Sequence, residues 1–348
     1  KSGEIANLNG HIENSSAFNG IITATVRDSK QLIVGRMNDP IETPTAFSFS
    51  DRPKTLYSGS NKVVNGKFQL SFAVPLDINY TDGTGLVNLY AVSDDDQQLA
   101  NGSNDRFTIG GSEKISNDSI GPSIYCYLNS PSFVNGGEVN STPYFVAQIN
   151  DANGINASGN GIGHNLQLIV DGDMSKTYVL NGNFAYDSGS YTSGMTNYNL
   201  PELTPGPHKL TFKAWDILNN SSTAELAFNV VHGLEPQLFS VSCTNNPART
   251  NTTFIINHDR NGGLIDCEID IFDLSGRSLW HHQESGVSTG NAYTVDWNLT
   301  SDGGERLQTG VYLYRVRISS DNGKNAVGIS KINYLIGIKK AVWSGKKN

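Results

Sequence analysis

The sequence predicts an all-β protein built from three consecutive immunoglobulin-like β-sandwich domains. First, the chain has 348 residues, and at ~100–150 residues per domain this length suits two or three domains. Second, it contains 36 Gly and is rich in Asn, and both residues favour tight turns and tolerate positive φ. Third, short runs with apolar residues at alternate positions recur between these turns, as in strands that bury one face.

The first predicted domain, residues 1–117, contains a hairpin. Asn65-Gly66 suits a type I′ turn, whose twist matches that of the flanking strands. Residues 62–64 precede this turn, and residues 67–74 follow it with apolar side chains at every second position. A stretch rich in Gly, Ser and Asn, residues 101–117, marks the end of the domain.

The second predicted domain, residues 118–233, ends in two runs in which apolar and polar residues alternate. Apolar residues alternate with polar ones in residues 210–214 and again in residues 224–230. Between them, the Asp and Asn side chains of residues 215–222 can bond their own backbone and close a turn. This arrangement resembles the last hairpin of many bacterial immunoglobulin-like modules.

The third predicted domain, residues 234–338, holds enough strand candidates for one sandwich, which needs about seven. Residues 310–318 have apolar side chains on both faces, so we expect a central strand there. Residues 339–348 form a basic tail. The strand candidates are residues 238–243, 252–258, 268–273, 278–282, 293–297, 310–318 and 326–338.

Charge and hydropathy exclude two classes of protein. The net charge is −8 and the pI is about 5.3, without the basic stripe of a nucleic-acid-binding protein. The acidity is concentrated in residues 118–233, which hold 3 basic and 9 acidic residues, whereas residues 234–348 hold 12 and 11. No stretch approaches the ~20 apolar residues of a membrane-spanning helix. Because the chain starts at Lys1 without an initiator Met or a secretory segment, we expect a processed product, a fragment or a cloned piece of a longer protein.

Three cysteines are too few for a disulfide-framed scaffold. Cys126 lies in a strand-like run, where a buried and inert thiol is expected. Cys243 and Cys267 could form a bridge between neighbouring strands or stay free, and the sequence leaves both alternatives open.

The third segment carries several motifs in a fixed order. They are Asn-Asn-Pro at residues 245–247, a strand and turn at residues 269–277, Val-Asp-Trp at residues 295–297, Asp-Gly-Gly at residues 302–304 and Gly-Val-Tyr-Leu-Tyr-Arg-Val at residues 310–316. In this order they resemble the C-terminal domain of cargo exported by the type IX secretion system of Bacteroidota. Asp273 to Arg277 also forms a turn by its own chemistry, with Gly276 supplying a positive φ.

The first two predicted domains point to a narrower group of proteins within this secretion system. Their succession, most specifically residues 159–171, is similar to the region after the peptidase domain in PorU-like sortases, which belong to the gingipain-like cysteine peptidases. The resemblance implies a parent enzyme that removes C-terminal signals from cargo proteins and joins the cargo to surface lipopolysaccharide. It also implies a place on the extracellular face of the outer membrane, reached through the periplasm, where the C-terminal domain docks on a PorV-type barrel of the secretion and attachment complex.

The same resemblance supplies a docking site but no catalytic site. The parent's peptidase chemistry requires a Cys thiolate beside a His in an α/β domain, and this chain has no βαβ pattern and no cysteine in such a context. We therefore expect a non-catalytic spacer and docking region that needs no cofactor. The docking residues implied by the resemblance are Asp273, Leu274, Ser275, Gly276, Arg277, Gly310, Val311, Tyr312 and Arg315.

Two further candidates involve oxygen-bearing side chains. Asp151, Asn153 and Asn156 offer the hard ligands that Ca²⁺ prefers, but they lack the full EF-hand spacing, and a self-bonded turn is favoured. His281 and His282 lie on opposite faces of a strand and cannot share one metal, so no metal site is predicted. Asp118-Ser119-Ile120 resembles the O-glycosylation signal of Bacteroidota envelope proteins, with Ser119 as the modified residue.

A second hypothesis is a type IX-secreted surface adhesin or carbohydrate-binding protein. Tyr186, Tyr191 and Tyr198 lie in a Gly/Ser-rich stretch, and a solvent-exposed platform of such rings would stack against sugars. Loop packing is the alternative role for these tyrosines.

Overall fold

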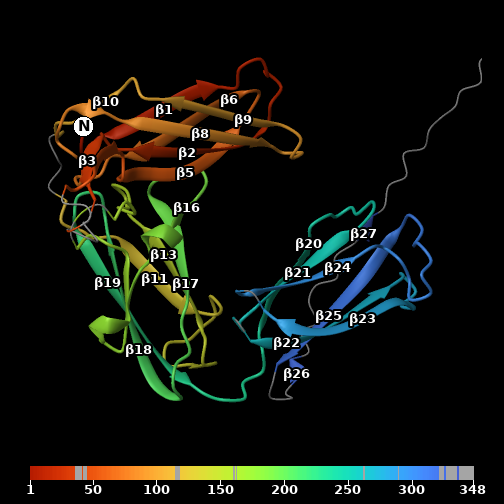
Figure 1. Ribbon diagram of the computed structural model, residues 1–348. Coiled ribbons are helices and arrows are strands. Elements are labelled where there is room, and N and C mark those ends of the chain that lie inside the picture. The colour runs from red at the N-terminus through yellow and green to blue at the C-terminus, as the bar shows by residue number, and fades with distance from the viewer. Residues whose placement is uncertain are drawn as a thin grey trace, which may run out of the picture. The chain divides into compact units, whose positions relative to one another are not determined.

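A computed structural model describes residues 1–35, 41, 45–113, 118–159, 161, 163–261, 263–288, 290–320, 325–326 and 335–336. Its described part consists of 27 β-strands and two short 3₁₀ helices (Figure 1), which confirms the predicted all-β class. Contacts divide the chain into two compact units. Unit 1 holds residues 1–126, 146–198 and 208–227, and unit 2 holds residues 127–145, 199–207 and 228–348. The three predicted domain boundaries stay a prediction.

Unit 1 begins with a sandwich of two antiparallel sheets. One sheet has the order β5-β2-β8-β9, and the other pairs β1 with β6. Apolar side chains of both sheets fill the space between them, among them Ile22, Leu70 and Phe72. The strands are β1 (Ile5–His11), β2 (Gly20–Arg27), β5 (Thr55–Val63), β6 (Lys67–Ala73), β8 (Leu86–Ser93) and β9 (Leu99–Asn104).

The predicted turn at Asn65-Gly66 is confirmed, with φ of 50° and 72° as a type I′ turn needs. Only Val64 and Lys67 pair across it. Beyond that bridge the two strands separate, because β5 pairs with β2 while β6 pairs with β1. The turn therefore joins the two layers of a sandwich rather than two neighbours in one sheet.

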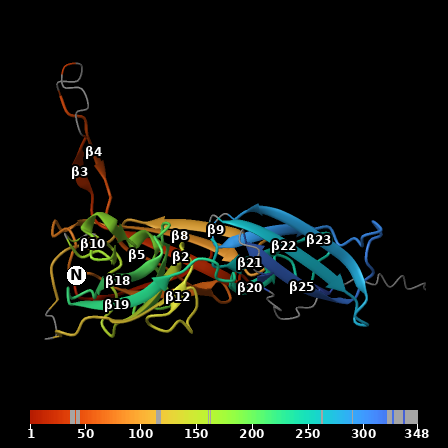
Figure 2. The same ribbon diagram turned by 90° about the horizontal axis from the view of Figure 1, so that it is seen from below.

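Two smaller strand pairs complete this part of unit 1. The pair β3 (Gln31–Val34) and β4 (Ser48–Asp51) forms a ribbon that stands away from the four-stranded sheet (Figure 2). β7 (Gly83–Thr84) pairs with β10 (Thr108–Ile109).

Two further sheets follow, with the orders β11-β13-β17-β16 and β12-β19-β18-β14-β15. The two alternating runs predicted in residues 210–214 and 224–230 lie in β18 and β19, which confirms them as strands. The polar turn between them is held by Asp216, whose Oδ1 accepts the backbone N–H groups of Leu218 and Asn220 at 2.9 and 2.7 Å. The elements are β11 (Ser123–Leu128), β12 (Glu138–Val139), β13 (Tyr144–Asn150), β14 (Gln167–Val170), η1 (Met174–Lys176), β15 (Thr177–Val179), η2 (Asn181–Asn183), β16 (Ala185–Tyr186), β17 (Ser193–Asn199), β18 (Gly206–Trp215) and β19 (Ser221–Val230).

The C-terminal part of unit 2 contains a sheet with the order β20-β21-β24 and a sheet with the order β23-β22-β25-β26, in which β27 also pairs with β25. Six predicted strands are confirmed. Of the seventh, residues 326–338, only short pieces are described, and the basic tail 339–348 lies outside the described residues. The strands are β20 (Leu238–Cys243), β21 (Thr252–His258), β22 (Leu264–Phe272), β23 (Ser278–Val287), β24 (Ala292–Trp297), β25 (Val311–Ser320), β26 (Asn325–Ala326) and β27 (Leu335–Ile336).

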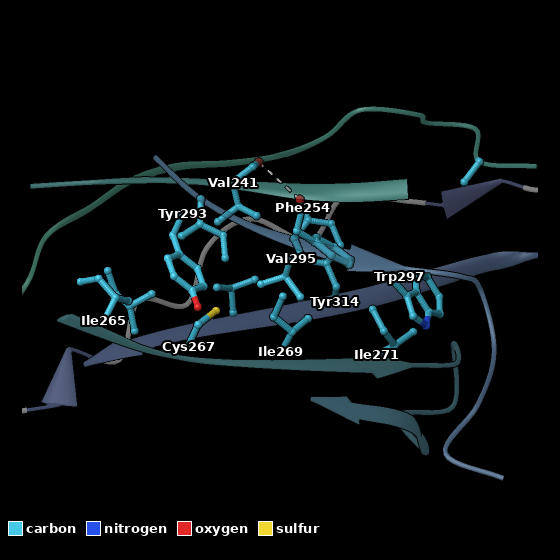
Figure 3. Close-up of a cluster of buried hydrophobic side chains, with 14 residues drawn as sticks. Val241, Phe254, Ile265, Cys267, Ile269, Ile271, Tyr293, Val295, Trp297 and Tyr314 are labelled. Carbon is cyan, nitrogen blue, oxygen red and sulfur yellow. Dashed lines mark hydrogen bonds between the residues drawn. The ribbon is translucent and has the colours of Figure 1, made fainter. Parts of the chain in front are cut away.

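The core of these two sheets is aromatic and aliphatic (Figure 3). Phe254 packs edge-on against Tyr314, with ring centroids 5.2 Å apart, and the Tyr314 hydroxyl donates to the carbonyl of Val241 at 3.4 Å. Trp297 is 2% exposed, as expected of a core residue. β25 has partners on both sides, which confirms the prediction of a central strand.

All three cysteines are free thiols. Burial raises the pKa of Cys126 and of Cys267 to about 12 and that of Cys243 to about 11. The thiolate is the reactive form of cysteine, so these side chains are poor nucleophiles. Within the described residues, no helix has the length and hydropathy that a membrane crossing needs.

Candidate functional site

The first part of the candidate docking site is the turn between β22 and β23, residues 273–277. Asp273 organises it, because its Oδ1 accepts the backbone N–H groups of Ser275 at 2.9 Å and of Arg277 at 3.1 Å. The hydroxyl of Ser275 also donates to Asp273, and the Arg277 Nε donates to Oδ2 at 3.1 Å. Hydrogen bonds from Ser275 and then Arg277 hold the pKa of Asp273 below its usual value. Gly276 has the expected positive φ, 84°.

Leu274 lies in the middle of this turn with 69% of its surface exposed. The turn around it is fixed by the bonds to Asp273, so the apolar side chain is presented on a well-defined backbone. An exposed Leu on its own needs no functional explanation. Whether Leu274 belongs to a larger binding surface depends on the residues that lie near it in the fold.

The second part is the start of β25. β25 runs antiparallel to β22, with Leu313 opposite Phe272 and Arg315 opposite Asp270. Since β22 ends at Phe272, the start of β25 and the turn after β22 lie at the same end of the sheet. We call this region, residues 273–277 and 310–315, the turn end.

Arg315 connects the turn end to the outer face of the sheet. Its Nε and Nη2 donate to Oδ2 of Asp270 at 3.1 and 2.8 Å, and its guanidinium lies 5.3 Å from the ring centroid of Phe272. Tyr312 lies on the opposite face of β25, where its hydroxyl donates to the carbonyl of Gln308 at 2.6 Å. Burial and then the charge of Asp273 raise the pKa of Tyr312.

An ion-pair network extends from Arg315 along the outer face. His281 Nδ1 lies 2.9 Å from Oδ1 of Asp270, and Arg317 donates to Glu268 at 2.6 Å. Burial opposes ionisation of Asp270, but hydrogen bonds from His281 and Arg315 outweigh it and lower its pKa. Glu268, Asp270 and His281 are close enough to hold a metal ion. Because two guanidinium groups already pair with both carboxylates, we interpret the group as an ion-pair network.

Sequence reasoning did not assign Asp270, Phe272 or His281 to the docking site. Asp270 and Phe272 contact Arg315, and His281 contacts Asp270. A signal was present, because Asp270 and Phe272 precede the Asp273 turn on one strand with the alternation of one face. His281 could be placed opposite Asp270 only after the register of β22 and β23 was known.

The three tyrosines named as possible ligand-binding residues do not form one platform. Tyr186 and Tyr191 pack against the core of the first sandwich, and Tyr198 packs against Tyr178 with ring centroids 4.7 Å apart. These contacts suit the alternative role of loop packing, although Tyr186 also borders a cavity.

The possible calcium ligands lie in two places. Asp151 Oδ1 accepts the backbone N–H groups of Asn153 and Gly154 at 2.8 and 3.1 Å, which are the bonds of a self-bonded turn. Asn156 instead donates to Asp77 at 3.0 Å. Burial raises the pKa of Asp151, and the charge of Asp118 adds to this effect.

Ser119 is exposed. The residue before it, Asp118, is held in place, because its Oδ1 accepts the N–H of Ile120 at 3.0 Å and its Oδ2 accepts the side-chain amide of Asn153. The Ser119 hydroxyl is therefore presented to solvent beside a fixed carboxylate.

The chain is similar to many solved structures, and the following three are among them. Dimeric latent PorU from Porphyromonas gingivalis is 30% identical to it, with a TM-score of 0.43, and the match covers 97% of this chain and 32% of that chain. The chain thus spans about a third of that PorU chain. A tetra-tandem repeat from the extending region of a large adhesion protein is 13% identical, with a TM-score of 0.24, over 96% of this chain and 74% of that one. The FN1–FN3 domains of chicken CNTN1 are 10% identical, with a TM-score of 0.21, over 96% and 98% of the two chains. No family model and no curated protein matches the chain.

Proposed function

We propose that the chain is a non-catalytic C-terminal part of a PorU-like cell-surface sortase, and that it serves as a spacer and docking region. The parent would act on cargo proteins with C-terminal signals at the outer membrane. In this proposal the turn end binds an outer-membrane barrel of the PorV type, as part of the secretion and attachment complex.

The observation that carries the proposal is the position of the two motifs. Residues 273–277 and 310–315 resemble motifs in the C-terminal domain of type IX cargo, and the antiparallel register of β22 and β25 brings them to one end of one sheet. Because both motifs lie at this one end, a single partner could contact them together. The 30% identity with PorU over 97% of the chain further supports the relation to the sortase.

The chemistry of the turn end suits a protein interface. Leu274 offers an exposed apolar anchor, and the Arg277 side chain beside it is 75% exposed. On the outer face, Phe272 lies under the guanidinium of Arg315. Interfaces gain most of their affinity from a few apolar, aromatic and Arg side chains that become desolvated on binding.

Binding of the full chain to a purified PorV-type barrel tests the proposal. We expect Leu274→Asp to weaken binding by about tenfold or more, because a buried carboxylate at the anchor costs over ~1.4 kcal/mol. Val287→Asp is the matched control. Val287 is 66% exposed and lies in the last pair of the same sheet, at the end away from the turn.

Two results would contradict the proposal. Absence of binding by the folded wild-type chain would remove the docking role. Equal weakening by the two substitutions would show that the barrel does not recognise the turn end. Thermal unfolding of both variants is the check that each is folded.

A further inference from the structure

Unit 1 contains a cavity of about 340 Å³ that the docking role does not use. Three neighbouring aromatic residues are among those that line it. Tyr57 and Tyr186 have ring centroids 5.0 Å apart, and Phe184 meets Tyr186 edge-on at 4.8 Å. The volume is at the lower end of the ~300–1,000 Å³ range of small-molecule sites.

The two tyrosine rings are held in place by their hydroxyl groups. The Tyr186 hydroxyl donates to the carbonyl of Ile155 at 2.7 Å, and that of Tyr57 donates to the carbonyl of Ser190 at 3.4 Å. On its other face Tyr57 stacks on Phe72, with centroids 5.1 Å apart. These contacts hold the aromatic cluster in place before any ligand arrives, which reduces the entropy cost of binding.

Neutral hydroxyl groups also line the cavity, among them those of Thr25 and Ser58. Thr25 and Ser58 lie directly opposite each other in β2 and β5, and their hydroxyl oxygens are 3.4 Å apart. The two hydroxyls share one hydrogen bond, so the second hydroxyl hydrogen and several lone pairs are available to a ligand. Among the described residues that line the cavity, none carries a charge.

The aromatic rings and neutral hydroxyls that line the cavity favour one chemical class of ligand over others. A charged ligand would lose its hydration without gaining a partner of opposite charge, which is costly. A purely apolar ligand would cover the hydroxyls of Thr25 and Ser58 without offering them any hydrogen bond beyond the one that they share. A sugar ring avoids both costs, because its C–H face packs on aromatic rings while its hydroxyls donate and accept.

We propose that this cavity binds one or two rings of a neutral saccharide, which would pack on Phe184 and Tyr186 and form hydrogen bonds with the hydroxyls of Thr25 and Ser58. The site is separate from the turn end, since all these residues belong to unit 1 and the turn end belongs to unit 2. The saccharide site and the docking role therefore succeed or fail independently.

Saturation-transfer NMR on the full chain tests the proposal, with maltose, cellobiose and lactose as neutral probes and glucuronic acid as a charged one, all at millimolar concentration. We expect at least one neutral disaccharide to bind and glucuronic acid to bind more weakly. Phe184→Ala should weaken that binding by about tenfold. Tyr90→Ala is the matched control, because Tyr90 is 49% exposed on β8 of the same unit and does not line the cavity.

Thr25→Val provides a second variant that keeps the side-chain shape and removes only the hydroxyl. It should weaken binding several-fold while leaving the unfolding temperature close to that of the wild type, so a loss of affinity cannot be ascribed to misfolding. The proposal is overturned if none of the neutral probes binds, if glucuronic acid binds as well as they do, or if Phe184→Ala and Thr25→Val bind like Tyr90→Ala.

Discussion

His258 illustrates what burial does to a single residue. Its side chain is fully buried at the end of β21. Nδ1 accepts the backbone N–H of Arg260 at 3.0 Å, so the neutral ring carries its proton on Nε2 and donates to the hydroxyl of Ser288, also at 3.0 Å. Burial and then the charge of Arg260 lower the pKa of His258 to about 4. The fold therefore holds this histidine in its neutral form.

This environment predicts a loss of stability in acid. An unfolded histidine has a pKa of about 6.5, so between pH ~6.5 and ~4 the unfolded chain binds a proton that the folded chain does not. The stabilisation from His258 is complete above pH ~6.5 and is lost as the pH falls towards 4, by at most about 3 kcal/mol. Urea unfolding at pH 7, 5.5 and 4.5 measures this loss.

His258→Gln isolates the effect of this one side chain. The neighbouring Asp259 has a pKa that burial raises, and its contribution has the opposite sign because the folded state favours its protonated form. Asp259 titrates in the wild type and in the variant alike, so the difference between their pH profiles belongs to His258. Parallel profiles over the whole range would contradict the prediction.

At the scale of elements, the turn at Asn65-Gly66 shows a local signal that the structure confirms. Gly66 has a φ of 72°, and a Cβ there would overlap the backbone carbonyl oxygen of Ser15. Both the backbone conformation and the space exclude a side chain. Gly66 is also buried, so this half of the turn is tightly constrained.

We expect Gly66→Ala to lower the free energy of unfolding by about 2 kcal/mol, through backbone strain and the clash with Ser15. Gly102→Ala is the matched control in β9 of the same sandwich, where a Cβ would meet nothing within 4 Å. Urea denaturation of both variants measures the difference. Equal stability of the two variants would be evidence against a strained turn.

The turn end shows which features of the candidate site can be predicted from local sequence patterns. The sequence predicted that Asp273 to Arg277 forms a turn, since Asp and Ser bond their own backbone and Gly tolerates positive φ. It could not place Arg315 over Phe272, because that contact depends on the register between β22 and β25. A shift by one residue would move Arg315 to the other face of the sheet.

At the scale of the whole molecule, the proposed route through the cell envelope can be tested by asking whether Ser119 is glycosylated. Ser119 is exposed and lies in an Asp-Ser-Ile sequence that resembles an envelope O-glycosylation signal. We expect a glycan on the peptide that contains Ser119 when the protein is isolated from its native cell, and mass spectrometry of that peptide measures it. The same peptide from cytoplasmic expression in another bacterium is the control, and an unmodified native peptide would rule the modification out.

The sequence by itself determined the all-β class, most strands and the chemistry of individual turns. These features depend on residues close together in the chain, where alternation of apolar side chains and the φ preferences of Gly and Asn act directly. The separation of β5 and β6 into two sheets and the meeting of residues 273–277 and 310–315 at one end of a sheet were decided only by the tertiary structure. So was the cavity, to which Tyr57 and Tyr186 come from distant parts of the chain. Such contacts follow from which strand edges pair and which faces are buried together, and a local pattern does not specify these choices.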